Sequence, residues 1–321
     1  MYVCKNFHKN MIKIGVFGIS GETITLTGRI KKDDNAVLTG FHLPAAPGAG
    51  LSRENRIFLN TDPEEVIMSS DCLLFADPHP DEMVFIRAAI RMSRPLFFLG
   101  TSRLPAGALP EIRDLAVEGG VHVHCYNPLR DHPLFAAAAA MAGRPLFTEI
   151  IRRWPGETSA GRLLTDNLLP SLEAVLHLNS TRPRRPLVGA YLLPDGAAGM
   201  VHLQMEFDDS MTALIRHEIP GEKETLLCRI TGGEGTATAD MAGGTLRFLD
   251  NGHTRSAQKK KIPVAGASNP LYHSWNAFLR QCAAPHPAVL EERIQAARLL
   301  EYALEKVRNK TIPSLSPEKN W

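Results

Sequence analysis

The chain has 321 residues, of which 44% are hydrophobic and 22% are charged, and its formal net charge at pH 7 is +2. These values are ordinary for a globular chain of about two domains and argue against nucleic acid as a partner. No apolar run reaches the roughly 18 residues of a membrane span. The five scattered cysteines include no CxxC pair, which argues against a disulfide framework or a cysteine metal site. We therefore expect a cytoplasmic protein that binds no metal.

The first strong signal is a strand followed by a glycine turn. Ile12–Phe17 is an apolar strand, and a helix is expected over Glu22–Lys31. A strand, a tight turn and a helix start is the order in which a Rossmann-type fold brings a dinucleotide pyrophosphate onto a helix N-terminus. Against the pattern G-x-G-x-x-G, Gly18 holds the first position, whereas Ser20 and Thr23 replace the other two glycines. The segment therefore favours a Rossmann-type fold more strongly than it favours dinucleotide binding. The Ser20 hydroxyl could nevertheless donate a hydrogen bond to a phosphate.

Strand and helix signals alternate through the first 130 residues. Further strands are expected at Ala36–Leu43, Asp71–Ala76, Pro95–Leu99 and Val121–Tyr126. Helices are expected at Pro63–Ser69 (capped by Thr61 or Asp62), Asp81–Met92 and Leu109–Glu118. Strands separated by helices imply parallel pairing with right-handed crossovers.

The character of the sequence changes after a helix expected at Leu134–Met141. Another helix is expected at Leu168–Leu178, with Asp166 as a candidate N-cap and Pro170 in its first turn. Strand-like runs then follow at Leu187–Leu193, Val201–Phe207, Thr212–Glu218, Leu226–Thr231, Thr236–Ala239 and Thr245–Leu249. Glycine-rich turns between these runs indicate a mostly antiparallel sheet.

The end of the chain is expected to be helical, at Tyr272–Cys282 and Ala288–Arg308, with Tyr272 and His273 at or just before the start of the first of these helices. The basic runs Arg182–Arg185 and Lys259–Lys261 are interpreted as solvated loops.

The predicted fold class is α/β, with a Rossmann-like doubly wound parallel sheet followed by an α+β domain that carries a large, mostly antiparallel open sheet. The expected division is a loose tail over 1–10, a dinucleotide-binding domain over 11–127, a substrate and dimerisation domain over 128–310, and a second loose tail over 311–321.

This organisation resembles the glucose–fructose oxidoreductase / inositol dehydrogenase (Gfo/Idh/MocA) family from Met11 onward. Lys13–Gly18 is similar to the family's opening strand, and Ser70–Pro78 to a strand that ends in a proline-bearing cofactor loop. Asn127–Pro133 resembles its N-x-x-R-x-x-P segment at the domain junction. The segments similar to its closing helices are Asn276–Arg280 and Glu291–Glu305.

The departures from that family concern its chemistry. The resemblance implies a lysine that binds the substrate hydroxyl, but the corresponding place is Leu99–Ser102, which has none. In the family's D-x-G-x-H-x-x-D motif, Asp166 is kept and Glu173 could stand for the last aspartate, whereas Pro170 occupies the position of the acid/base histidine. Phe41–Pro44 offers no carboxylate for a ribose hydroxyl.

Several residues remain candidates for a site. Residues implied to contact a cofactor are Gly18, Ile19, Ser20, Gly21, Asp77 and Pro78, and residues implied to line a substrate cleft are Asn127, Arg130, Asp166 and Glu173. The replacement catalytic candidates are His79, His124 and Tyr126. His79 could instead be part of a helix cap, His124 could pair with His122 on one strand face, and Arg130 could bind a ligand anion or stabilise the fold.

Two functions follow from these patterns. The first is a divergent family member without the usual hydride transfer, acting as a binding, regulatory or partner subunit for a small, sugar-like ligand. The second is an active NAD(P)-dependent oxidoreductase on a sugar or polyol with relocated catalytic groups. NAD or NADP binding stays open, because Pro44–Gly50 carries neither an acid nor an arginine and Arg53 is the nearest candidate. A homodimer or higher oligomer is expected through the sheet of Leu187–Leu249, and a purely structural dimer module is a third alternative.

Overall fold

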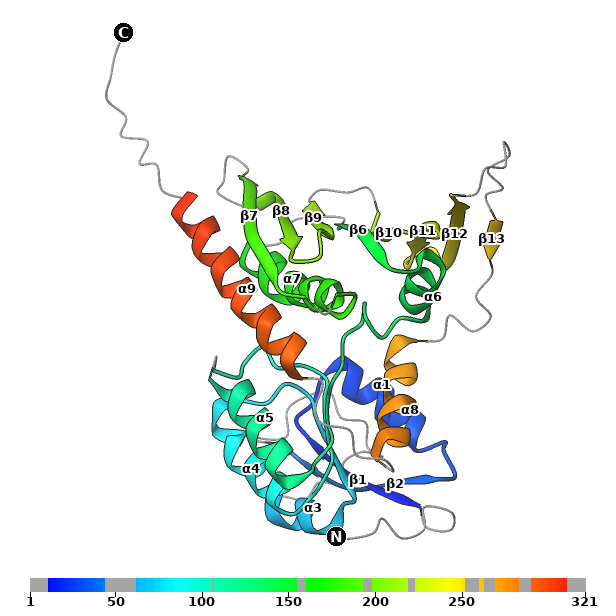
Figure 1. The fold of residues 1–321 in the computed structure, drawn as a ribbon. Coiled ribbons are helices and arrows are strands. Elements are labelled where there is room, and N and C mark those ends of the chain that lie inside the picture. The colour runs from blue at the N-terminus through cyan, green and yellow to red at the C-terminus, as the bar shows by residue number, and fades with distance from the viewer. Residues whose placement is uncertain are drawn as a thin grey trace. The chain divides into compact units, whose positions relative to one another are not determined.

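The computed structural model describes residues 11–43, 62–105, 107–154, 160–179, 181–192, 198–218, 223–251, 260–262, 269–282 and 290–310 (Figure 1). The chain divides into two compact units, one of Met1–Asp131 with Ser268–Ile294 and one of His132–Ala267 with Gln295–Trp321. The two expected tails, the Pro44–Gly50 loop and Arg53 lie outside the described residues.

The first unit is built on a parallel sheet of five described strands in the order β2-β1-β3-β4-β5. The strands are β1 (Ile12–Phe17), β2 (Ala36–His42), β3 (Cys72–Phe75), β4 (Leu96–Phe98) and β5 (Val123–Cys125). Every residue of β3 and β4 is buried, as a sheet covered on both faces requires. The predicted doubly wound sheet is confirmed.

Helices cover both faces of this sheet (Figure 1). Those described are α1 (Gly21–Ile30), α3 (Pro63–Ser69), the short 3₁₀ turn η1 (Pro80–Glu82), α4 (Met83–Arg91), α5 (Ala108–Gly119) and α8 (Pro270–Cys282). α3, α4 and α5 lie together on one face, while α1 and α8 contact each other on the other. Asp62 caps α3 as expected, because its carboxylate accepts a hydrogen bond from the Glu64 amide at 3.0 Å.

The second unit is built on a sheet of eight described strands in the order β13-β12-β11-β10-β6-β9-β8-β7. They are β6 (Pro145–Arg153), β7 (Pro183–Leu192), β8 (Ala198–Phe207), β9 (Thr212–Glu218), β10 (Thr225–Gly232), β11 (Gly235–Asp240), β12 (Thr245–Asp250) and β13 (Lys260–Ile262). Only the β6–β9 pair of this sheet is parallel among the described strands, so the predicted mostly antiparallel sheet is confirmed.

Two helices of the second unit lie on the same face of the eight-stranded sheet (Figure 1). α6 (Pro133–Ala142) contacts β10, β11 and β12, and α7 (Ala160–His177) contacts β8 and β9. The last helix, α9 (Leu290–Lys310), reaches β7, where the Tyr302 hydroxyl donates to the Pro186 carbonyl at 3.4 Å.

The structure corrects four expectations about elements. β6 was not predicted. α7 begins at Ala160, so Asp166 is not its N-cap and Pro170 lies inside the helix instead of in its first turn. The basic runs are not simply loops, because Arg184 and Arg185 belong to β7 and Lys260 and Lys261 belong to β13. Tyr272 and His273 lie in the first turn of α8, which begins at Pro270. None of the helices in the described part is both long and apolar enough to cross a membrane.

Candidate functional site

The turn after β1 lies at the carboxyl end of the parallel sheet and depends on Gly18. Its φ is +78°, a conformation that side-chain-bearing residues rarely adopt, and its amide donates to the His42 carbonyl at 2.9 Å. A Cβ at this position would lie 3.2 Å from the Cβ of Ala76. The first fingerprint glycine is therefore required by the close approach of β1 and β3, whatever the turn binds.

Ser20 and Thr23 form a capping box at the start of α1. The Ser20 hydroxyl oxygen accepts from the Thr23 amide at 3.1 Å, and the Thr23 hydroxyl oxygen accepts from the Ser20 amide at 3.2 Å. Both replacements of the fingerprint glycines thus satisfy backbone donors that a helix N-terminus otherwise offers to an anion. Between Ser20 and Thr23 lie Gly21, whose added Cβ would meet nothing within 4 Å, and the exposed acid Glu22.

Asp77 connects the loops that follow β3 and β4. Its carboxylate accepts hydrogen bonds from the Ser102 amide and the Ser102 hydroxyl, both at 2.9 Å, and lies 3.3 Å from the Arg103 Nε. A Cβ added at Gly100 would lie 3.2 Å from the Asp77 Oδ1 and 3.3 Å from the Ala76 carbonyl. Gly100 is in the segment where the resemblance implies a lysine, so the space next to that position is filled by Asp77. The following Pro78 is buried.

His79 takes part in a cap at the start of η1. Its Nδ1 lies 3.1 Å from an Asp81 carboxylate oxygen, and its amide donates to the Glu82 Oε2 at 2.7 Å. The His79 side chain is 55% exposed, so it is accessible to solvent in spite of these contacts. Glu82 is buried, and burial raises the pKa of its carboxyl group.

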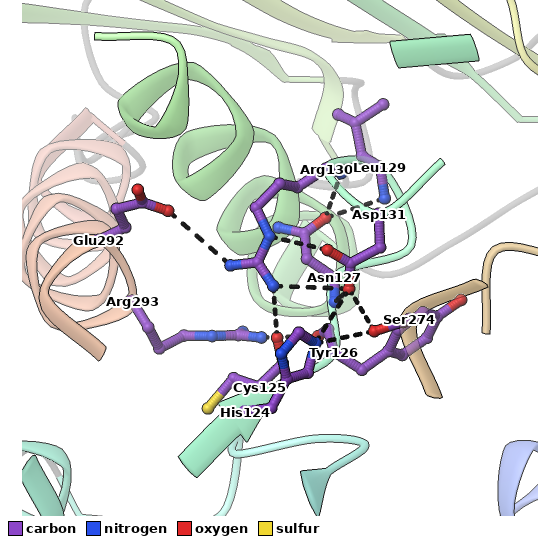
Figure 2. A network of polar contacts seen from close by, with 10 residues as sticks. All are labelled: His124, Cys125, Tyr126, Asn127, Leu129, Arg130, Asp131, Ser274, Glu292 and Arg293. Atoms are coloured by element: carbon purple, nitrogen blue, oxygen red, sulfur yellow. Dashed lines mark hydrogen bonds and ion pairs between the residues drawn. The ribbon is translucent and has the colours of Figure 1, made fainter. Parts of the chain in front are cut away.

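A polar network gathers at the end of β5 around Asp131 (Figure 2). The Asp131 Oδ2 accepts from the Ser274 hydroxyl at 2.7 Å and from the Asn127 amide at 3.0 Å. The Ser274 Oγ also lies 2.8 Å from the His124 Nε2. Burial alone would raise the pKa of Asp131, but the contact with His124 and the charge of Arg130 hold that pKa well below its usual range.

Arg130 is held by contacts within the first unit (Figure 2). Its Nε donates to the Asp131 Oδ1 at 2.8 Å and its Nη2 to the Cys125 carbonyl at 2.7 Å, while its Nη1 lies 3.8 Å from the Glu292 carboxylate. The residue is 8% exposed. The guanidinium is therefore already engaged by acceptors of its own unit.

The other two candidates at the end of β5 are also enclosed. The His124 ring stacks on Phe97 with a centroid distance of 5.1 Å and shares a face with the His122 ring, 6.3 Å away. Burial, together with the charges of Asp131 and Glu22, raises the pKa of Tyr126, so its phenol stays protonated at neutral pH. Within the described part of the chain, no group of three metal-ligating side chains occurs.

The remaining candidates divide between the units. Asn127 and Arg130 belong to the first unit, and Asp166 and Glu173 lie seven positions apart on α7 of the second. Glu173 is fully buried, whereas the Asp166 side chain lies outside the described residues. Asp131 and Ser274 are not among the residues predicted from the sequence, where 143 positions separate the two partners.

Comparison with known proteins supports the fold. No protein-family model matches the chain, and no curated protein matches it by sequence. Among solved structures, UDP-N-acetylglucosamine 3-dehydrogenase GnnA from Acidithiobacillus ferrooxidans superposes with a TM-score of 0.79 at 17% identity, covering 92% of this chain and 99% of that one. A Gfo/Idh/MocA family oxidoreductase from Vibrio cholerae gives a TM-score of 0.74 at 12% identity over 93% and 99% of the two chains.

A third similar structure contains a cofactor. GenD2 from gentamicin A biosynthesis, in complex with NAD, gives a TM-score of 0.71 at 16% identity over 94% of this chain and 95% of its own. The structural neighbours are thus Gfo/Idh/MocA oxidoreductases, and this chain has their fold. At these identities the comparison establishes the fold, and the chemistry has to be argued from the site.

Proposed function

We propose that this chain is a catalytically silent relative of the Gfo/Idh/MocA oxidoreductases, which binds a small, sugar-like ligand as a binding, regulatory or partner subunit in the cytoplasm. The observation that carries the proposal is the Gly100–Asp77 contact. Where the family resemblance implies a lysine, the backbone approaches the Asp77 carboxylate so closely that a Cβ would lie 3.2 Å from it. Hydride transfer from an alcohol needs a group that takes the hydroxyl proton, and glycine has none.

Two of the three groups that could replace the lysine and histidine, His124 and Tyr126, are engaged elsewhere. His124 contacts Ser274 and stacks on Phe97, and Tyr126 is 8% exposed with a raised pKa. A general base must reach the proton that it removes directly or through one water, and a buried, hydrogen-bonded group does so poorly. Pro170, which aligns with the family's histidine, lies inside α7 and carries no titratable group.

The described residues also fit a dinucleotide poorly. Gly18 keeps the tight turn, but the Ser20 hydroxyl already accepts from the Thr23 amide and the exposed Glu22 places a negative charge on the first turn of α1. A pyrophosphate at this helix start would find fewer unbonded backbone amides than at an uncapped helix, and the negative charge of Glu22 would repel it. We therefore expect weak binding of NAD or NADP at most.

Titration of the purified protein with NADH and with NADPH, followed by nicotinamide fluorescence, tests this account. We expect no saturable signal below millimolar cofactor. A thermal-shift series with sugars and sugar nucleotides, including the UDP-N-acetylglucosamine that appears in the name of a structural neighbour, tests the ligand class. Stabilisation by one of these compounds without any turnover is the expected pattern, whereas tight cofactor binding together with polyol oxidation contradicts the proposal.

One observation keeps an active enzyme as the alternative. His79 follows β3 at the carboxyl end of the sheet, and its side chain is 55% exposed. If His79 were the proton acceptor, His79→Gln would abolish NAD(P)-dependent oxidation of a sugar, while Asp81→Asn, which alters only its exposed neighbour, would leave most of that activity. On our proposal neither protein oxidises the sugar.

We further propose that the open face of the eight-stranded sheet pairs with a second copy of the chain. α6 and α7 cover one face, and on β7 the large apolar residues Leu187 and Tyr191 are 63% and 59% exposed. Light scattering after size exclusion is expected to give a dimer or higher oligomer that Tyr191→Glu weakens. A monomer for the unaltered chain at micromolar concentration rules this pairing out.

A further inference from the structure

The buried side of α8 is mostly apolar and ends in Cys282. Leu271, Trp275, Phe278 and Cys282 are spaced by four, three and four residues, so they lie along one side of the helix. The first three are at most 3% exposed, and Cys282 is partly buried. The ring centroids of Trp275 and Phe278 each lie 5.2 Å from that of Phe97 on β4. This side of α8 is therefore the one that packs on the sheet.

The direction of α8 brings its last residue toward the beginnings of the strands. Ser274, near the start of the helix, bonds to Asp131 beyond the end of β5. Phe278, one turn later, stacks on His122, which precedes β5, at 5.6 Å. Cys282 lies one further turn along and ends the helix. It therefore extends toward the edge of the sheet where β3 begins.

Cys72 is the first residue of β3 and faces α8. It shares a core cluster with Leu74, Trp275 and Phe278, and Cys282 packs against that same cluster. Cys72 is 2% exposed. Burial raises the pKa of its thiol, and the negative charge of a Cys282 thiolate raises that pKa further. Two thiols from residues 210 positions apart thus enter one apolar layer between α8 and the sheet.

We propose that Cys72 and Cys282 form a redox-sensitive pair whose disulfide fixes the end of α8 to the start of β3. The oxidant is a small-molecule disulfide of the glutathione class. The Cys282 thiolate attacks it and releases one small thiol, and the Cys72 thiolate then attacks the mixed disulfide and releases the second. The protein loses two electrons and two thiol protons to the small disulfide, whose two released thiolates take up those protons through water and so become two thiols.

Two physical consequences follow. Cys282 reacts first because it is the more accessible thiol, and the second step is slow because the buried Cys72 must lose its proton before it can attack. Because α8 also carries Ser274, which donates to Asp131, the bond would hold in place the helix that supports the polar network at the opposite edge of the sheet. The pair would then act as a redox lock on the first unit.

The chain contains matched controls for this proposal. Cys125 is buried on β5, where it follows His124 and so points to the opposite face of the sheet from α8. Cys228 is buried on β10 in the other unit, and burial raises the pKa of its thiol to about 12. Neither residue is part of the α8 core cluster.

The test treats the folded, full-length protein with millimolar oxidised glutathione and follows intact mass and non-reducing peptide maps. We expect loss of two hydrogen masses, a linked pair of peptides containing Cys72 and Cys282, and a rise in Tm of at least about 5 °C that dithiothreitol reverses. Cys125→Ser is expected to keep the linked pair. Cys282→Ser, a change at a helix end that does not threaten folding, is expected to lose it, as is Cys72→Ala.

Three results would overturn the proposal. The first is a lasting glutathione adduct on Cys282 that never resolves into the intramolecular bond. The second is the absence of any linked peptide after prolonged oxidation, and the third is a linked peptide that forms only in denaturant. The proposal is independent of whether the chain binds a cofactor, so the nicotinamide titration does not bear on it.

Discussion

Gly100, in the loop after β4, and Gly21, the first residue of α1, both lie at the carboxyl edge of the parallel sheet, but their surroundings differ. A Cβ at Gly100 meets the Asp77 carboxylate and the Ala76 carbonyl, whereas a Cβ at Gly21 meets nothing within 4 Å. We expect Gly100→Ala to lower the free energy of unfolding by about 1–2 kcal/mol, and Gly21→Ala to change it by less than about 0.5 kcal/mol. Urea unfolding of the two variants measures the difference, and equal effects would remove the argument that Asp77 fills this space.

Asp131 makes a second prediction at the scale of one residue. Its carboxylate has a lowered pKa in the folded state, so it stabilises the fold fully above its unfolded value, about 3.9, and that contribution disappears as the pH falls through the lowered folded-state value. Asp131→Asn is expected to cost about 3 kcal/mol at neutral pH because it removes the negative charge that lies nearest to the buried Arg130 guanidinium.

The control for Asp131 is Asp114→Asn, which alters a carboxylate that is 68% exposed and paired with Arg113. We expect it to be nearly neutral. The difference in the free energy of unfolding between Asp131→Asn and the unaltered protein should become smaller below about pH 4. A gap that stays constant to pH 3 in urea unfolding would mean that the charge of Asp131 is not what stabilises the network.

The start of α1 carries a prediction at the scale of an element. If Ser20 serves as the N-cap, Ser20→Ala lowers the free energy of unfolding by about 1 kcal/mol and leaves any weak nucleotide binding unchanged. Thr23→Ala removes the other half of the box, and the two losses are expected to be less than additive because the residues share one set of contacts. Chemical denaturation and cofactor titration of the same variants separate a capping role from a phosphate-binding role. If the Ser20 hydroxyl bound a phosphate, Ser20→Ala would also lower the affinity for the cofactor.

The start of α6 carries the prediction for pH dependence. The His132 Nδ1 accepts from the Leu134 amide at 3.1 Å, which requires that nitrogen to be unprotonated, and burial lowers the pKa of His132. The cap therefore stabilises the fold above the unfolded pKa near 6.5 and is lost as the pH falls through the lower folded-state pKa.

We expect the difference between the protein and its His132→Asn variant to change by about 1 kcal/mol between neutral pH and pH 5, because asparagine caps a helix without titrating. Thermal unfolding at several pH values measures it. Parallel pH profiles for the two proteins would show that this cap does not titrate.

The elements also show where sequence patterns succeed. β1 and β9 have the bounds that were predicted from their apolar patterns, and α3 has both its bounds and its cap. β6 was missed because its apolar residues fall on both faces: Ile150 lies on the helix-covered side, and Ile151 and Phe147 on the other, so alternation is absent. α7 was predicted too short because a proline usually marks a first turn, whereas here the helix continues through Pro170.

At the scale of the whole molecule, the order of elements was predictable and the polar network was not. The order follows from local apolar patterns and turn residues, which act over a few positions. The contact between Ser274 and Asp131 joins α8 to the end of β5 across 143 positions, and no local sequence motif predicts it. The same holds for the pair of Arg293 and the Tyr126 carbonyl, 167 positions apart. The absence of the lysine and the histidine implied by the family resemblance was visible in the sequence. That Asp77 lies beside Gly100 could be learned only from the three-dimensional structure.

The most direct test of the central claim is hydride transfer itself. The protein is incubated with saturating NAD or NADP and a panel of polyols, sugars and sugar nucleotides, and nicotinamide reduction is followed at high enzyme concentration. The account predicts no reduction above that of a denatured sample with any compound, including those that raise Tm. Stoichiometric or catalytic reduction with even one sugar, lost in His79→Gln, would contradict it and establish an active oxidoreductase with a relocated proton acceptor.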